Sequence, residues 1–355
     1  MPEHPEPQLP TAPRREALRF SGRAGEYFRI WIVNLALSVM TLGLYSPWAK
    51  VRRNKYFYRH THLAGAAFDY HADPVAILKG RLIAVALFVA YSVLTAMQSA
   101  WSALVALAGA LAFPWLLVRS RMFALRNTSY RGVRFRFRPA YAEAYRTLIG
   151  GMLLSLLTLG LYLPHFQYRR ARLLVDNSAF GTLPLRLGER TGSPDFYAIY
   201  LGAGLLALLC VFLLGIFSVA FAPPQLAGME AGAAAPGFQL GVTLLSALVY
   251  LAFYFGVEGA VARVVFNGIE AGRHQLHCRW SLPGYVFLRL SNLLAILCSA
   301  GLLIPWAAVR LHRYRIEHMS AAIDGELDDV VAAEEQEVSA LGEEIGETFD
   351  FDLGL

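Results

Sequence analysis

Uncharged apolar runs of membrane length constrain this chain more than any other feature. A transmembrane helix needs about 20 mostly apolar residues, and the run 82–118 supplies almost two such lengths without a charge. It predicts a helical hairpin that turns near 98–102. The run 196–266 predicts a second hairpin around a loop at 223–236. With 56% hydrophobic and 16% charged residues and a mean hydropathy of +0.43, the chain lies outside the range of soluble domains.

Three further apolar segments, at 30–48, 147–164 and 290–308, stand alone beside these hairpins. Each has about 18 apolar residues, a length that suits a single span better than a segment that enters the membrane and turns back. We therefore expect an all-α polytopic membrane protein with about seven hydrophobic helices.

The distribution of basic residues bears on this topology. If the three lone segments span the membrane, the 32 Lys and Arg residues divide 18 to 14 between its two sides, which is a weak form of the positive-inside rule. If the lone segments turn back, all 32 face the cytoplasm. The positive-inside rule favours lone segments that turn back, whereas the length of the segments favours single spans. We expect seven spans. Both arrangements place the C-terminal tail in the cytoplasm.

The lone segments also resemble one another. Thr-Leu-Gly-Leu-Tyr occurs at 41–45 and again at 158–162, and Pro-Trp occurs at 47–48 and again at 305–306. Repetition of one supersecondary unit predicts internal repeats and a pseudo-symmetric bundle.

Short stretches of alternating character follow several of the apolar segments. Apolar residues that alternate with arginine or another polar residue are typical of a half-buried strand, because successive side chains of a strand point to opposite faces. The basic links therefore predict a small membrane-proximal β-sheet. Its strands are expected at 67–71, 133–138, 183–187 and 276–280.

Composition divides the chain into three parts. A proline-rich N-terminal segment, 1–26, precedes the repeat-containing transmembrane domain at 27–323, and an acidic tail follows at 324–355. The tail carries a charge of −12 and the rest of the chain +18.

One long motif resembles a known family. The sequence TLGLYSPWAKVRRNKYFY at 41–58, the turn at 61–65 and the sequence FDYHADPVAILKGR at 68–81 resemble the YjgN family of bacterial inner-membrane proteins. The resemblance covers most of 20–324. It implies a polytopic protein of the bacterial inner membrane, and since the molecular function of the family is uncharacterised, it implies no catalytic residue.

Three polar residues are candidates for an intramembrane site. Glu258 lies near the cytoplasmic end of a predicted hairpin helix, where it either marks a transport pathway or pairs with an arginine such as Arg263 or another link arginine. Asn34 and Asn292 occupy the same register of two lone segments, where an amide either joins helices or contacts a substrate. We expect the structural role for all three.

A basic aromatic helix follows the first lone segment. Aromatic and basic side chains at a membrane interface anchor a protein against anionic headgroups. The candidate lipid-headgroup contacts are Trp48, Lys50, Arg52, Arg53, Lys55 and Tyr56. The expected partner is therefore the lipid bilayer, self-association stays open, and the basic charge requires no nucleic acid.

No nucleophile elbow, phosphate loop or HExxH motif is present, and the histidines have no metal-ligand spacing. We therefore expect no cofactor and no enzymatic activity. The sequence favours a non-enzymatic membrane protein that handles lipid or small solutes or acts as an envelope scaffold. The alternative is a small-solute transporter that uses polar residues within the bundle.

Overall fold

The computed structural model describes residues 14–99, 101–220 and 236–324. Half of the proline-rich segment (1–13), the loop at 221–235 and the acidic tail beyond Asp324 lie outside the described residues.

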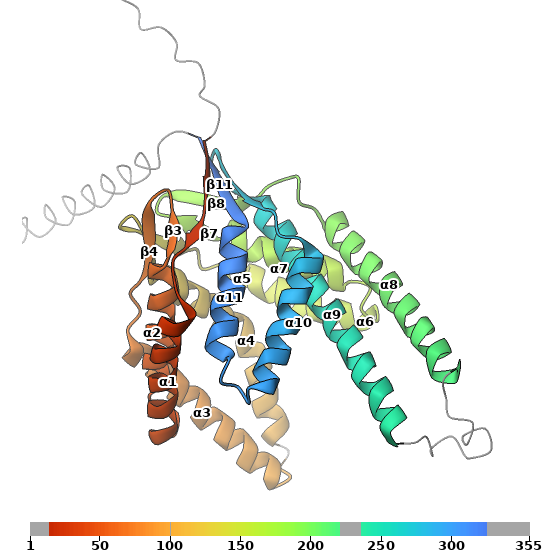
Figure 1. Ribbon diagram of the computed structural model, residues 1–355. Coiled ribbons are helices and arrows are strands. Elements are labelled where there is room, and N and C mark those ends of the chain that lie inside the picture. The colour runs from red at the N-terminus through yellow and green to blue at the C-terminus, as the bar shows by residue number, and fades with distance from the viewer. Residues whose placement is uncertain (1–13, 100, 221–235, 325–355) are drawn as a thin grey trace, which may run out of the picture.

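Within the described residues, four helices are long and apolar enough to cross a membrane. They form two hairpins, as the sequence predicted (Figure 1). The helices are α3 (Pro74–Ala96), α4 (Trp101–Arg126), α8 (Ser193–Ala220) and α9 (Pro236–Gly268).

The prediction of seven hydrophobic spanning helices is wrong, because the lone segments do not form single long helices. Each folds into a helical hairpin that begins and ends at the same side of the molecule (Figure 1). The first hairpin is α1 (Ala24–Met40) and α2 (Ser46–Arg59). The second is α5 (Tyr141–Tyr145), η1 (Arg146–Gly150), α6 (Gly151–Leu157) and α7 (Leu163–Asp176). The third is α10 (Leu282–Cys298) and α11 (Ile304–Glu317).

The turns of these hairpins explain the error. In the first turn, Leu42 and Gly43 adopt left-handed conformations with φ of 50° and 89°, which reverses the chain. Leu42 is 96% exposed and Leu159, at the second turn, is 94% exposed. Because the turn residues are themselves apolar, the hydropathy pattern continues through the reversal. Equivalent turns have φ pairs of 50° and 90° at Leu159 and Gly160, and of 48° and 91° at Ala300 and Gly301.

The small sheet predicted for the basic links is also an underestimate. The structure has one antiparallel sheet of eleven strands, in the order β1-β11-β10-β9-β8-β7-β6-β5-β4-β3-β2. The strands are β1 (Arg14–Ala17), β2 (Arg19–Phe20), β3 (Thr61–Leu63), β4 (Ala66–Tyr70), β5 (Thr128–Tyr130), β6 (Val133–Phe137), β7 (Ser178–Phe180), β8 (Leu183–Leu187), β9 (Ile269–Ala271), β10 (His274–Cys278) and β11 (Met319–Ile323).

Tight turns join the strands into hairpins. Ala64 and Gly65, between β3 and β4, have φ of 45° and 80°, and positive φ at both central residues is the geometry that fits strand twist. The five-residue strands β4, β6 and β8 each pair with two three-residue strands. For example, β4 pairs Ala67 with His62 of β3 and Asp69 with Ser129 of β5.

Residues 14–20, the closing segment, join the two ends of the sheet. β1 pairs with β11, β2 pairs with β3, and the one residue between them, Leu18, donates its N–H to the Met319 carbonyl over 3.0 Å. The sheet therefore closes into a ring through strands from opposite ends of the chain.

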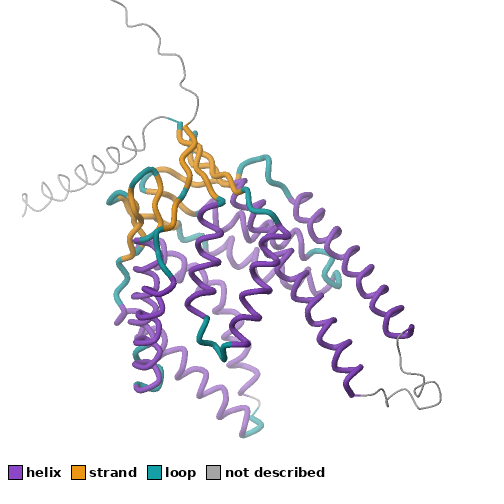
Figure 2. The backbone as a smooth tube through the Cα atoms, in the orientation of Figure 1, coloured by secondary structure: helices purple, strands orange, loops and turns teal. Residues whose placement is uncertain are grey.

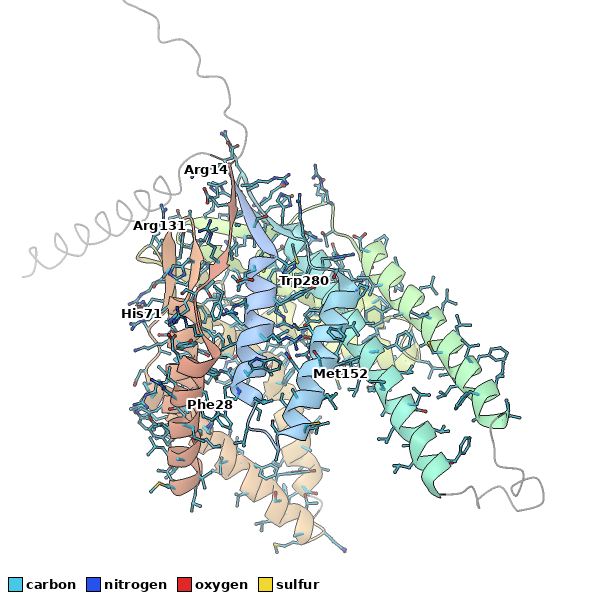
Figure 3. The ribbon with its side chains drawn as sticks, in the orientation of Figure 1. Arg14, Phe28, His71, Arg131, Met152 and Trp280 are labelled. Atoms are coloured by element: carbon cyan, nitrogen blue, oxygen red, sulfur yellow. The ribbon has the colours of Figure 1, made fainter. Side chains whose placement is uncertain are left out.

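The ring lies at one end of the molecule, and all the helices extend from it in the same general direction (Figure 2). The arginines Arg14 and Arg131 lie at the ring end, whereas Phe28 lies along the helices (Figure 3). Trp280 and Tyr285, which are fully buried, pack at the junction of the two layers.

Candidate functional site

The ring of strands contains a cavity of about 260 Å³, which we call the chamber. Every strand from β3 to β11 contributes a side chain, and Leu18 completes the wall at the closing segment. The lining residues are Leu18, Leu63, Phe68, Tyr130, Phe135, Phe180, Leu183, Leu185, Ile269, Ala271, His274, Gln275, Leu276, Met319, Ala321 and Ile323.

Strand alternation places these side chains. In β6 the chamber residue Phe135 lies between Arg134 and Arg136, which are both exposed. Aromatic rings pack tightly along one side, with ring centroids 4.7 Å apart for Phe68 and Tyr130 and 5.0 Å apart for Phe135 and Phe180. The ring thus has a charged outer face and an apolar interior.

Each of the three polar side chains in the lining makes a hydrogen bond. The Tyr130 hydroxyl donates to the Leu63 carbonyl over 2.7 Å. The imidazole Nδ1 of His274 accepts the Asp324 N–H at 3.1 Å, and the Gln275 amide donates to Glu270 at 3.5 Å. The chamber therefore presents apolar surface and can bind an apolar group, but it offers no paired acid and base for catalysis.

The size of the chamber sets it apart from a packing defect. A cavity needs only about 10–15 Å³ of probe-occupied volume to hold one water, and apolar cavities of about 150 Å³ stay dry and bind small apolar molecules. Protein interiors contain few voids larger than a water molecule. At about 260 Å³, the chamber has room for an apolar ligand.

Glu258 lies in a separate cluster that joins three helices. Its carboxylate, on α9, is 2.8 Å from a guanidinium nitrogen of Arg289 on α10 and 2.7 Å from one of Arg315 on α11. The Tyr285 hydroxyl donates to the same carboxylate over 3.0 Å. The partners of Glu258 are thus Arg289 and Arg315 rather than Arg263, and the arrangement suits a structural role.

The two asparagines each hold one short hairpin together. The buried Asn292 on α10 donates to the Ala307 carbonyl over 3.1 Å and accepts from Arg310 over 2.9 Å. Asn34, which is also buried, accepts from Arg52 at 3.5 Å. Among the hydrogen bonds and ion pairs of the described residues, none joins Glu258 to either asparagine, so the structure does not bring the three together in one site.

The candidate headgroup contacts on α2 divide into two sets. Lys50, Arg52 and Arg53 are exposed, and Trp48 and Lys55 are half-buried. Tyr56 is buried and its hydroxyl donates to the Arg23 carbonyl over 2.8 Å, so it belongs to the core rather than to a headgroup site. Burial raises the pKa of Tyr56 to about 12.

Sequence reasoning missed the chamber. The alternating stretches at 133–138 and 183–187 predicted strands with one apolar face, but not that this face would be the inside of a ring. Within residues 14–99, 101–220 and 236–324, no group of three His, Cys, Asp or Glu side chains could hold a metal ion.

Comparison with known proteins adds a family but no activity. A family described as "Bacterial protein of unknown function (DUF898)" matches residues 15–348. The chain is 33% identical over 132 residues to "Inner membrane protein YjgN" of Salmonella typhimurium strain LT2, a match over 36% of this chain and 33% of that protein.

The protein of the same name from Escherichia coli strain K12 is 31% identical over 125 residues, which is 33% of this chain and 30% of that protein. The chain thus matches about one third of the length of each relative. No solved structure matches. With its four apolar helices it is an integral membrane protein, and it belongs to the YjgN family, whose members are described as bacterial proteins of unknown function (DUF898).

Proposed function

We propose that this protein is a non-enzymatic lipid-binding protein of the bacterial inner membrane, and that the chamber receives an acyl chain. The observation that carries this proposal is the chamber itself, whose wall combines side chains from nine strands with Leu18 and presents apolar atoms. Small closed sheets fill their interior with side chains, whereas larger ones hold one apolar ligand.

The place of the ring supports a membrane lipid as the ligand. The ring lies where the four long helices and the three short hairpins all begin or end (Figure 2). The tips of the short hairpins carry exposed apolar residues such as Leu42 and Leu159, which suit the hydrocarbon layer. A lipid at the interface would lie directly beneath the ring.

The orientation of the ring is part of the proposal. With four spans and three returning hairpins, all the basic links face one side of the membrane, and the positive-inside rule makes this side the cytoplasm. The relatives are named inner membrane proteins. We therefore assign the ring and the C-terminal tail to the cytoplasmic face, where exposed residues such as Lys50 and Arg53 attract anionic headgroups.

The similar hairpins support an origin by duplication. The three turns have the same backbone conformation, and the pair Asn34 and Arg52 recurs in register as Asn292 and Arg310. The three-residue strands β3, β5, β7 and β9 alternate with the five-residue strands β4, β6, β8 and β10, so the same periodicity extends around most of the ring.

Photo-crosslinking tests the lipid proposal. A phospholipid with a diazirine near the end of one acyl chain is incorporated with the protein into nanodiscs, and crosslinked peptides are mapped by mass spectrometry. Bilayer lipid labels the four long helices. Lipid in the chamber also labels β6, β8 and β10, which no bilayer chain reaches from outside the ring.

Two variants make this test specific. Ala271→Phe adds a ring to the chamber wall and should remove the strand crosslinks while the helix crosslinks remain. Ala67→Phe, at an exposed position of β4, should keep both sets. Crosslinks confined to the helices in the unmodified protein would contradict the proposal.

A small-solute transporter is the second candidate. The observation in its favour is a groove of about 460 Å³ between α8 and α9, with Ser246, Tyr200 and Tyr250 among its lining residues. Against it, the side chains of Glu258 and Asn292 are engaged in helix packing. Solute uptake that is lost in Ser246→Leu at unchanged protein stability would favour transport.

A further inference from the structure

The strand register assigns the arginines of the ring to an inner or an outer face. Residues that lie opposite each other in a strand pair share a face, and neighbours along a strand point to opposite faces. In β1, Arg14 pairs with the chamber residue Ile323. Arg15 and its uncharged partner Ala322 therefore lie on the outer face, where Arg15 is exposed.

Three further arginines are exposed on the outside of the ring. Arg134 and Arg138 lie on the face of β6 opposite to the chamber residue Phe135, and the cross-strand partner of Arg134 is the uncharged Ser129. Arg273 is exposed in the turn between β9 and β10. We call the following four residues the outer arginines: Arg15, Arg134, Arg138 and Arg273.

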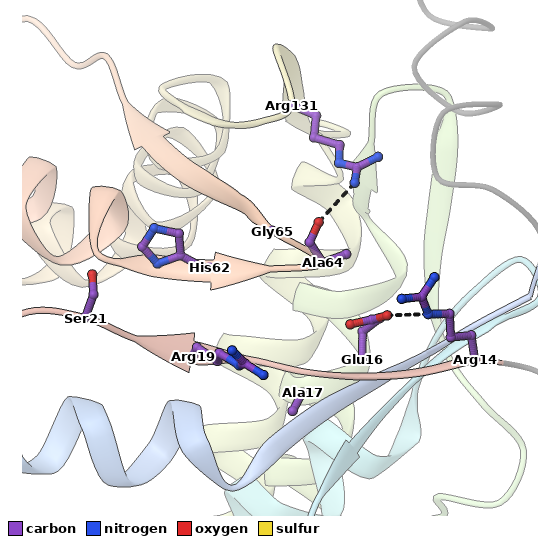
Figure 4. Close-up of a pocket in the computed structure, with 9 residues that line it drawn as sticks. All are labelled: Arg14, Glu16, Ala17, Arg19, Ser21, His62, Ala64, Gly65 and Arg131. Atoms are coloured by element: carbon purple, nitrogen blue, oxygen red, sulfur yellow. Dashed lines mark hydrogen bonds and ion pairs between the residues drawn. The ribbon is translucent and has the colours of Figure 1, made fainter.

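Other arginines of the ring already have partners. In the hollow beside the closing segment, Arg14 lies 2.5 Å from Glu16, and Arg131 donates to the Ala64 carbonyl over 3.2 Å (Figure 4). The outer arginines differ from these. Among the ion pairs and side-chain hydrogen bonds within residues 14–99, 101–220 and 236–324, none involves an outer arginine. They are therefore available to an acidic partner.

The acidic tail begins between two of the outer arginines. β11 ends at Ile323 and lies between β1 and β10. The N–H of the next residue, Asp324, donates to Nδ1 of His274 on β10 over 3.1 Å, which fixes the start of the tail at the rim of the ring. Arg273 precedes His274 in the chain, and Arg15 lies on β1 at the other side of β11.

The tail has the charge and the length to reach all four. Residues 325–355 contain eleven Asp or Glu and no Lys or Arg. When extended, 31 residues span about 100 Å. Arg134 lies on β6, five strands from β11, which is about 24 Å along the sheet at about 4.8 Å per strand. The outer arginine that lies far around the ring is thus well within the reach of the tail.

We propose that residues 325–355 bind the outer arginines of the same molecule. A single exposed ion pair contributes little to stability. A tethered segment, however, meets its site at an effective concentration in the millimolar range, so several weak contacts suffice. The tail then occupies the basic outer face of the ring, and any other polyanion must displace it. The proposal does not depend on a lipid in the chamber.

Distances between spin labels test this contact on the full chain in nanodiscs of zwitterionic lipid. In a background without native cysteines, labels are placed at Thr182, in the exposed turn between β7 and β8, and at Ala340 in the tail. At about 0.05 M salt, docking predicts a narrow distance distribution. At about 1 M salt, where the Debye length is about 3 Å, the distribution should broaden and shift to longer distances.

The sign of the salt effect separates docking from a tail without a binding site. Charges of one sign repel each other and extend a chain, so an undocked acidic tail contracts as salt rises. A docked tail is released instead, and its mean distance from the ring increases. A distribution that stays the same or contracts between low and high salt would overturn the proposal.

Matched variants identify the binding surface. Changing the four outer arginines together to Gln should lower the ratio of docked to undocked molecules at low salt by about tenfold or more. The control changes four exposed basic residues of α2 and α7, and should leave the distances unchanged. These are Lys50, Arg53, Arg169 and Arg170. An equal effect of the two variants would overturn the proposal, and thermal unfolding checks that both are folded.

A synthetic peptide of residues 325–355 provides an independent test. In a full-length variant whose eleven tail acids are changed to their amides, the outer arginines should be vacant. Calorimetry should then show the peptide binding about tenfold more tightly to this variant than to the unmodified protein, whose own tail competes. Equal affinities would overturn the proposal.

Two further controls complete the test. Dilution of the labelled protein with an excess of unlabelled protein should leave the narrow distribution intact, and its loss would assign the tail to a second copy and overturn the proposal. Ala271→Phe should abolish acyl-chain crosslinking in the chamber and leave the tail distances unchanged. The docking of the tail and the lipid in the chamber can therefore fail separately.

Discussion

The ring of Phe166 occupies the space that a Cβ atom on Gly151 would need. Gly151 begins α6, and Phe166 lies opposite on α7. In the first short hairpin the corresponding positions hold Asn34 and Ala49, so the larger side chain has moved from one helix to the other. Both arrangements keep the two helices of a hairpin in close contact.

Gly151→Ala should therefore destabilise the second hairpin. Overpacking of this kind costs about 1–3 kcal/mol of unfolding free energy. The control is Gly150→Ala, since no atom lies within 4 Å of a Cβ at this neighbouring position. Thermal unfolding in detergent should show a lower midpoint for Gly151→Ala alone, and equal midpoints would contradict the packing described.

A labelling experiment checks the four-span arrangement. In a background without Cys210, Cys278 and Cys298, single cysteines replace Ser99 at the tip of the first long hairpin and Glu189 in the exposed loop after β8. A membrane-impermeant maleimide added to intact cells should label position 99 only. Labelling at 189 would restore the seven-span arrangement, in which this loop is external.

The two asparagines should differ in their contribution to stability. Asn292→Leu removes two side-chain hydrogen bonds, at 3.1 Å and 2.9 Å, whereas Asn34→Leu removes a single contact at 3.5 Å. Interhelical hydrogen bonds in membranes contribute about 0.6 kcal/mol each. We expect a loss of about 1 kcal/mol for Asn292→Leu and a smaller loss for Asn34→Leu, measured by unfolding in detergent. Loss of function without loss of stability would instead indicate a substrate contact.

Glu258→Gln should weaken the contact between α9, α10 and α11. It removes one carboxylate from two arginines, and because all three side chains are a quarter to a third exposed, we expect a moderate loss of about 2 kcal/mol. Glu317→Gln, which removes a surface ion pair with Arg313 at 3.8 Å, should change the unfolding free energy by less than about 0.5 kcal/mol. Equal effects of the two substitutions would show that the Glu258 cluster is not structural.

His312 should make stability depend on pH. It lies outside the four spanning helices, 3.0 Å from the Thr61 hydroxyl and against the Phe20 ring. Burial, with a smaller contribution from Arg315, lowers its pKa from 6.5 to about 4. Between pH 6.5 and 4 the unfolded chain therefore binds a proton that the folded protein does not.

The free energy of unfolding should accordingly fall as the pH is lowered through this window, by up to about 3 kcal/mol, and level off below it. His312→Asn should remove this part of the pH dependence, whereas His318→Asn, at an exposed imidazole, should retain it. Denaturant unfolding at several pH values measures both. An unchanged pH profile in His312→Asn would mean that its imidazole has the same pKa in the folded and the unfolded protein.

The long hairpins were predictable from the sequence because uncharged runs such as 82–118 have one physical solution in a bilayer. The short hairpins were not predictable in this way, because a hydropathy pattern does not show that the chain turns back at Thr, Leu and Gly at 41–43. The distribution of basic residues did indicate that the lone segments turn back, since only returning hairpins place all of the basic residues on one side of the membrane. Segment length was given more weight than charge, and charge was the better guide.

The candidate site was less predictable than the fold. Each alternating stretch predicts one strand, but the chamber needs nine strands and a particular order between them. The pairing of Arg14 with Ile323 joins residues from opposite ends of the chain, and no local pattern specifies it. The contact of Glu258 with Arg315 likewise depends on how α9 and α11 meet, so sequence reasoning proposed Arg263 or another link arginine, which includes Arg289, but not Arg315.

The closing segment has a consequence for biosynthesis. Residues 14–20 are translated before the other strands of the ring, but their partner β11 is complete only once Ile323 has been translated. Until then β1 and β10 lack β11, the strand that lies between them, and unpaired edges readily join foreign strands. Ring closure is therefore a late event that requires translation through β11, and a chain truncated before Met319 keeps an open edge that quality-control proteases and chaperones can recognise.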